Sequence, residues 1–151
     1  MSDLTVWQRF SEVVSQSPQK IAISSDSVSI TYQELYERAA SLSCSINHAL
    51  NKSSATSRIA FLIEDRISAV TSILSVLHLG HAFIPLDPED PLDRLKLILN
   101  DSTPSLLLTT NDELNKAESI SASVKILNLD KLNFKYKELL IINRKSPFNF
   151  T

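Results

Sequence analysis

The scarcity of glycine constrains this chain more than any other feature, because Gly80 is the only glycine among 151 residues. Loops that wrap a phosphate group with backbone amides need several glycines, since side chains block the approach of the ligand. The chain therefore contains neither a Walker loop nor a dinucleotide-binding fingerprint. Gly80 lies in the segment 78–91, which also holds three of the six prolines and a predicted strand between two helix boundaries.

Length and composition are typical of one globular domain. A chain of 151 residues with 43% hydrophobic and 21% charged residues is large enough to bury a core. The net charge of −2 excludes a general attraction of the whole molecule to nucleic acid or anionic membrane. Residues 131–151 carry five basic residues and one acidic residue. We interpret this basic tail as a solvated chain end.

Cysteine usage and hydropathy predict a cytoplasmic protein. Cys44 is the single cysteine, which rules out an internal disulfide and favours a reducing compartment. No neighbour in the sequence would activate its thiol, so we interpret Cys44 as an inert packing residue. No apolar segment is long enough to cross a bilayer, and the N-terminus lacks the pattern of a signal peptide.

The N-terminal third predicts a helix, a hairpin and a second helix. Helical spacing of apolar residues indicates a helix over 5–16, and alternation predicts strands over 20–24 and 28–31. Thr31 and Glu34 form a capping box that starts the second helix near Tyr32. The predicted core face of the first helix consists of Val6, Trp7, Phe10, Val13 and Val14. That of the second consists of Leu35, Ala39, Leu42, Ile46 and Ala49.

After residue 57, predicted strands and helices alternate. Asp65 is the expected N-cap of a helix that Gly80 ends, and Asp90 caps a helix that Pro91 opens. A weak helix is expected over 112–118. The predicted strands cover 58–63, 82–86, 105–109 and 124–129. The predicted core faces of the first two helices are Ile67, Val70, Ile73, Leu74 and Leu77, then Leu92, Leu95, Ile98 and Leu99.

Strands joined through helices run parallel, with right-handed crossovers. The sequence therefore predicts an α/β fold, a three-layer sandwich with a mainly parallel sheet and an N-terminal helix plus β-hairpin. The whole chain, residues 1–151, is expected to be a single unit. Beyond Asp130 the pattern fades, and Leu139–Ile142 is a candidate further strand.

Polar residues follow the predicted strands, where open parallel sheets bind ligands. Carboxylates gathered there could hold Mg²⁺, as in a phospho-acceptor receiver domain. The residues at the strand ends are Glu64, Asp65, Asp87, Thr109, Thr110, Asp130 and Lys131. The alternative, which we favour, is that Asp65, Asp87 and Asp90 only cap helices and close turns.

Other candidate sites have weaker patterns. His78 and His81 flank Gly80, but three histidines and one cysteine do not assemble a closed zinc site, so we interpret both as helix-end residues. The acidic segment 87–93 lacks the central glycine of a calcium loop. No serine lies in a glycine-flanked elbow. We therefore assign no catalytic, cofactor-binding or metal-binding residue.

The order of motifs resembles the N-terminal part of the amino-acid-activating adenylation domains of nonribosomal peptide synthetases, within the adenylate-forming ligase superfamily. Residues 7–22 resemble the opening helix and first strand. Ile-Thr-Tyr-Gln-Glu-Leu at 30–35 resembles the first core motif of this family, and residues 77–87 resemble the second. The match continues through 88–95 and 99–109, and covers residues 5 to about 130, with 131–151 as a tail.

The resemblance implies a parent activity of ATP- and Mg-dependent aminoacyl-AMP formation. The family's phosphate loop, substrate pocket and catalytic lysine lie beyond the matched motifs. The chain is therefore expected to be a truncated or split fragment, inactive alone, whose partner is the remainder of a split adenylation domain. An interaction module that docks such a fragment is the alternative. The chain departs from the family at 53–57 and at Thr103-Pro104, where glycine is usual, and at Phe83, where tyrosine is usual.

Overall fold

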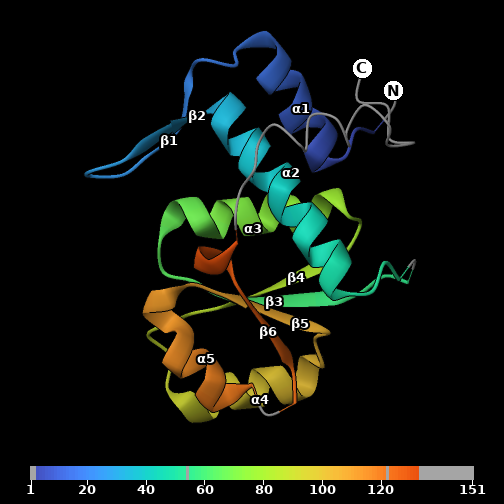
Figure 1. The fold of residues 1–151 in the computed structure, drawn as a ribbon, viewed down its shortest axis with the longest axis vertical. Helices are drawn as coiled ribbons and strands as arrows, with labels where there is room; N and C mark the ends of the chain where they lie inside the picture. Colours follow the sequence, from blue (N-terminus) through green and yellow to red (C-terminus); the bar gives the residue numbers. More distant parts are fainter. Residues whose placement is uncertain (1–2, 54, 122, 133–151) are drawn as a thin grey trace.

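A parallel four-stranded sheet forms the centre of the computed structural model, which describes residues 3–53, 55–121 and 123–132. β3 (Arg58–Leu62) lies between β4 (Ala82–Leu86) and β5 (Leu106–Thr109), and β6 (Lys125–Asn128) pairs with the other side of β5. The four strands, and the parallel direction that their helical connections predict, are confirmed (Figure 1).

Helices cover both faces of this sheet, so the predicted three-layer arrangement is confirmed (Figure 1). α2 (Tyr32–Ala49) and α3 (Arg66–His78) lie on one face, and α4 (Leu92–Ser102) and α5 (Leu114–Ile120) on the other. The α2–α3 core consists of Leu42, Ile46, Ile59, Phe61, Ile63, Val76, Leu106, Leu108 and Leu129. The α4–α5 core consists of Ala60, Leu62, Leu86, Leu95, Leu99, Leu107, Ala117 and Ile120.

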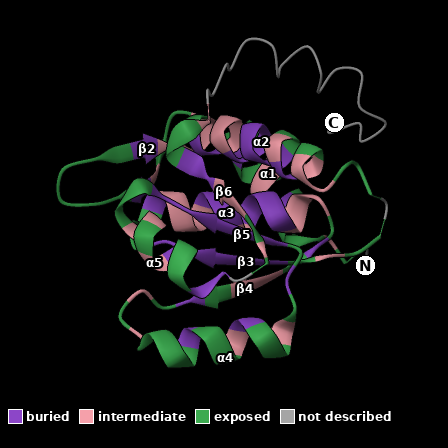
Figure 2. Cartoon of the chain, turned by 60° about the horizontal axis from the view of Figure 1, so that its bottom comes forward, coloured by how far each residue is buried: buried purple, intermediate pink, exposed green. Residues whose placement is uncertain are grey.

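β3 shows why the central strands read as continuous apolar runs. Ile59 and Phe61 belong to the α2–α3 core, whereas Ala60 and Leu62 belong to the α4–α5 core. Successive side chains of a strand point to opposite faces, and both faces are covered here. Buried positions accordingly follow the central strands β3 and β5, and exposed positions follow the outer sides of the helices (Figure 2).

An N-terminal unit packs on the outer side of α2 and α3. It comprises α1 (Val6–Gln16) and the antiparallel hairpin of β1 (Ile21–Ser24) and β2 (Ser29–Thr31), as predicted. Its α1 core consists of Trp7, Ile23, Ile30, Leu35, Ala39, Ile67 and Leu74. The predicted face of α1 was too wide, because Val6 and Val13 are exposed and only Trp7 and Val14 are fully buried.

Helix ends follow the predicted local signals at most positions. Thr31 and Glu34 form the expected capping box, and the Asp65 carboxylate accepts the Ser68 N–H at 2.8 Å. Gly80 has φ +76°, and the N–H groups of Gly80 and His81 donate to the carbonyls of Leu77 and Val76 at 3.0 and 3.1 Å. These two bonds form a Schellman motif, which requires the left-handed backbone that glycine adopts at little cost.

The start of α4 corrects the prediction. Pro91, with ψ 146°, precedes the helix instead of opening it, and Asp90 makes no capping hydrogen bond. Asp90 instead pairs with Arg94 at 3.3 Å, one helical turn later. Leu92, predicted in the core, is 42% exposed because it occupies the first helical position, beyond the edge of the sheet contact.

The C-terminal elements agree with the prediction apart from their boundaries. The weak helix is a 3₁₀ turn, η1 (Asn111–Glu113), followed by α5, and a second turn, η2 (Leu129–Lys131), follows β6. The candidate strand Leu139–Ile142 and the basic tail after Leu132 lie outside the described residues. Within the described parts of the chain, no helix combines the length and apolarity that a membrane crossing requires.

Replacing Thr103 with glycine is expected to raise the free energy of unfolding by about 0.5–1 kcal/mol. Thr103 ends α4 with φ +43°, a left-handed conformation that is costly for a β-branched residue. Arg58 partly offsets this cost, because its guanidinium donates to the Ser102 carbonyl and the Thr103 hydroxyl at 2.5 and 2.7 Å. Urea unfolding followed by circular dichroism measures the change.

The control for this prediction is Ser102→Gly, which places glycine at the last helical position of α4. It is expected to lower stability by about 0.5–1 kcal/mol, since glycine has no strain to relieve there. A Thr103→Gly protein that is less stable than the original would show that the Arg58 contacts outweigh the backbone strain.

Candidate functional site

The carboxyl edge of the sheet is the candidate site, because all four strands end there in the same direction. β3 leads into Glu64 and Asp65, β4 into Asp87, β5 into Thr109 and Thr110, and β6 into Asp130. The polar residues predicted to follow the strands are therefore brought to one edge.

The carboxylates at this edge complete local backbone structure. Asp65 caps α3, Asp87 accepts the Glu89 N–H at 2.9 Å, and Asp130 accepts the Asn111 N–H at 2.7 Å. Each of these bonds satisfies an amide that the local fold leaves without a helical or strand partner. The prediction that Asp65 and Asp87 cap a helix and close a turn is confirmed by their bonds. Asp90, the third residue of that prediction, pairs with Arg94 instead.

A hydrogen-bonded network joins the ends of β5 and β6. The Asn128 amide donates to the Asn111 side-chain oxygen at 2.8 Å, and the Asp130 N–H donates to the Asn128 side chain at 3.0 Å. The buried Thr109 hydroxyl donates to the Leu62 carbonyl at 3.0 Å. Sequence reasoning missed Asn111 and Asn128. The Asn-x-Asp spacing of 128–130 was the available signal, because asparagine commonly bonds the backbone two residues later.

The magnesium-binding interpretation receives no support from these contacts. Among the residues that the structure describes, no three His, Cys, Asp or Glu side chains gather closely enough to hold a metal ion. In the acidic segment, Asp87 closes a turn and Asp90 pairs with Arg94. Asp65, Asp87 and Asp130 are engaged with the protein's own amides, and Asp90 with the Arg94 guanidinium.

The two histidines beside Gly80 face different partners. The His78 ring stacks on Trp7, with ring centres 4.2 Å apart, and burial lowers the pKa of His78 to about 4. His81 accepts the Ser57 N–H at its Nδ1 atom at 3.0 Å, and burial lowers its pKa as well. Both therefore have structural roles at the end of α3, as the helix-end interpretation predicts. Cys44 lies off the buried stripe of α2 and is exposed, so the prediction that it is a packing residue is wrong. Partial burial raises the pKa of its thiol.

Comparison with known proteins places the chain in a family. The sequence profile of the family described as "AMP-binding enzyme" matches residues 10–149. Tyrocidine synthase 3 of Brevibacillus parabrevis is 37% identical over 108 residues, which are 71% of this chain and 2% of that protein. One of the polypeptides of the mycosubtilin synthase of Bacillus subtilis is 33% identical over 143 residues, which are 94% of this chain and 5% of that protein.

Solved structures agree on the fold. IdnL7 superimposes with a TM-score of 0.75 at 23% identity, over 87% of this chain and 26% of that one. The N-terminal subdomain of Klebsiella oxytoca NpsA gives 0.73 at 19% identity, over 87% of this chain and 33% of that one. The chain thus spans a small part of the relatives that it matches. It belongs to the AMP-binding enzyme family, and it corresponds to the N-terminal part of an adenylation domain of the nonribosomal peptide synthetase type.

Proposed function

We propose that this chain supplies the N-terminal scaffold of an adenylation domain that activates an amino acid with ATP, and that the 151-residue polypeptide has no such activity alone. The family match over residues 10–149 carries the first part. The second part is supported by the single glycine, because a backbone cradle for phosphate needs several. The engagement of Asp65, Asp87 and Asp130 with the protein's own amides supports it further.

The proposed partner is the remainder of an adenylation domain, which would bring the groups that bind ATP, Mg²⁺ and the amino acid. The similarity to the N-terminal subdomain of NpsA supports such a partner. The proposal includes a cytoplasmic location, supported by the single Cys44 and the reducing compartment that it favours.

The proposal is tested by amino-acid-dependent exchange of pyrophosphate into ATP. The purified chain is incubated with ATP, Mg²⁺ and each of the common amino acids, beside a complete adenylation domain of known substrate as positive control. We expect exchange at the background level for the chain alone. Exchange above background, lost on removal of the amino acid, would refute the proposed inactivity.

A second experiment tests the partner. The remainder of the single adenylation domain that contains the matched 143-residue region of the mycosubtilin synthase polypeptide is produced separately and added to the chain. We expect the mixture to gain exchange activity that neither polypeptide has, and heat-denatured chain to give none. A mixture that stays inactive and does not form a complex in size-exclusion chromatography would refute this partner, whatever the result for the chain alone.

A further inference from the structure

Trp7 is the most deeply buried contact that α1 makes with the described part of the molecule. Trp7 is 4% exposed and is the only fully buried residue of α1 that belongs to the α1 core. Neither the α2–α3 core nor the α4–α5 core contains a residue of α1. The sheet and its covering helices are therefore packed around apolar clusters that do not depend on α1.

Trp7 lies on a platform of rings from two helices. Its indole stacks on His78 of α3 at 4.2 Å and on Tyr36 of α2 at 5.3 Å, with interplanar angles of 29° and 28°. Phe10, one turn further along α1, lies 6.2 Å from the Tyr36 ring and 6.3 Å from the Tyr32 ring. His78 is the member of this platform that changes charge in mildly acidic solution.

Burial favours the neutral imidazole. A charge inside an apolar cluster has a high free energy unless water or a counter-charge reaches it. Burial lowers the pKa of His78 to about 4, from an ordinary value of 6.5. The face of an indole attracts a cation, which opposes this effect. Desolvation is the larger influence on this half-buried imidazole, whose ring stacks on Trp7, so protonation should loosen the stack.

Other titratable groups around this contact do not replace His78 as the sensor. Tyr36 of α2 stays neutral in acid, since burial raises its pKa. Arg9 and Glu12 of α1 are exposed and paired with each other at 3.7 Å. His81 follows α3 and bonds the Ser57 N–H through Nδ1, so its protonation would disturb the loop before β3 instead of α1.

We propose that α1 is a pH-sensitive strap: when the His78 imidazole takes up a proton, Trp7 leaves the ring platform and α1 detaches, while the sheet and α2–α5 stay folded. The detached state binds the proton more tightly, so detachment increases as the pH falls from 6.5 to about 4. The gap between these values corresponds to an increase of at most about 300-fold in the detachment equilibrium constant.

Tryptophan fluorescence tests this proposal directly, because Trp7 is the only tryptophan in the chain. The full chain is titrated from pH 7.5 to pH 4, with emission and far-ultraviolet circular dichroism recorded on the same samples. We expect a red shift of the emission below pH 6.5, before the main loss of helical signal. His78→Phe keeps an aromatic ring without a titrating group and should remove the red shift. His48→Phe, at an exposed position near the end of α2, should keep it.

His78→Gln is a second control, in case the phenylalanine ring does not fit on the platform. Glutamine also lacks a group that titrates in this pH range. A red shift that persists in both His78 variants would overturn the assignment of His78. Constant emission down to pH 4, or emission and helical signal that change together, would overturn the strap.

Discussion

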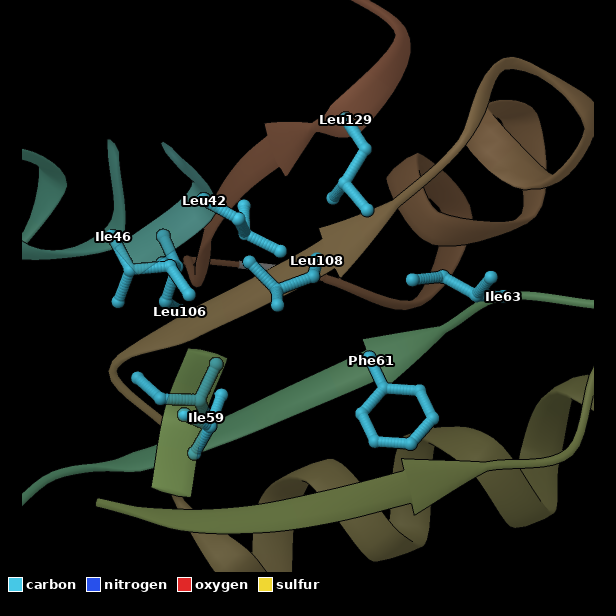
Figure 3. Packing of buried hydrophobic residues seen from close by; sticks show 9 residues of the cluster. Leu42, Ile46, Ile59, Phe61, Ile63, Leu106, Leu108 and Leu129 are labelled. Atoms are coloured by element: carbon cyan, nitrogen blue, oxygen red, sulfur yellow. The ribbon is translucent and has the colours of Figure 1, made fainter. Parts of the chain in front are cut away.

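Replacing Leu108 with alanine is expected to lower the free energy of unfolding by about 2–5 kcal/mol. Leu108 is 0% exposed and lies on β5, an interior strand of the sheet. Figure 3 shows it among the other labelled residues of the α2–α3 core, which come from α2, β3, β5 and the segments after β3 and β6. Alanine leaves a cavity that covered strands close only partly, so transfer and cavity costs add. Urea unfolding followed by circular dichroism measures the loss.

Leu97→Ala is the matched control, because it makes the same substitution on the outer side of α4, where Leu97 is 60% exposed. Its stability is expected to stay within about 0.5 kcal/mol of the original. Equal losses at the two positions would mean that Leu108 is not enclosed as the structure describes. A small loss at Leu108 alone would mean that the α2–α3 core collapses readily around the missing atoms.

Local signals explain why the elements could be predicted from the sequence. The capping box at Thr31, the N-cap at Asp65 and the glycine at position 80 each act through backbone bonds within a few residues. The apolar run over 58–63 depends only on burial of both faces of a strand. Such signals do not need knowledge of distant contacts, and the structure confirms all four.

Contacts between segments that are distant in the sequence explain why some buried residues of α3 were not predicted. α3 touches the sheet on one side and α1 on another, so Val76 is buried in the α2–α3 core although it lies off the predicted stripe. Thr71, Ser72 and Ser75 are also buried in α3. A search for apolar periodicity overlooks small polar residues that allow two helices to approach closely.

At the candidate site, too, the features set by local signals were predicted and those set by distant contacts were not. The strand pattern correctly brought Asp65, Asp87 and Asp130 to one edge, because parallel strands end together. Asn111 follows β5 and Asn128 ends β6, so their pairing required the register of β5 with β6. Asp90 was assigned as a cap from its position before proline, whereas its pairing with Arg94 competes for the same carboxylate.

The helix–helix contact of α2 with α3 leads to the second large expected effect. Ser75 is 0% exposed, and its single hydroxyl proton is shared between the Thr71 carbonyl at 2.6 Å and, across the contact, the Ala39 carbonyl at 2.9 Å. A leucine at this position would push the helices apart and remove both bonds. We expect Ser75→Leu to lower the free energy of unfolding by about 3 kcal/mol, measured by urea unfolding.

Two variants separate the causes of this loss. Ser75→Ala removes the hydroxyl without adding volume and should cost about 1 kcal/mol, so the remainder for leucine reflects overpacking. Ser119→Leu makes the leucine substitution at an exposed position of α5, where the serine hydroxyl also donates to the carbonyl one turn earlier. It should change stability by no more than about 0.5 kcal/mol, because the added side chain extends into water. If Ser75→Leu were as mild as Ser119→Leu, α2 and α3 would have to lie further apart than the cross-helix bond between Ser75 and Ala39 allows.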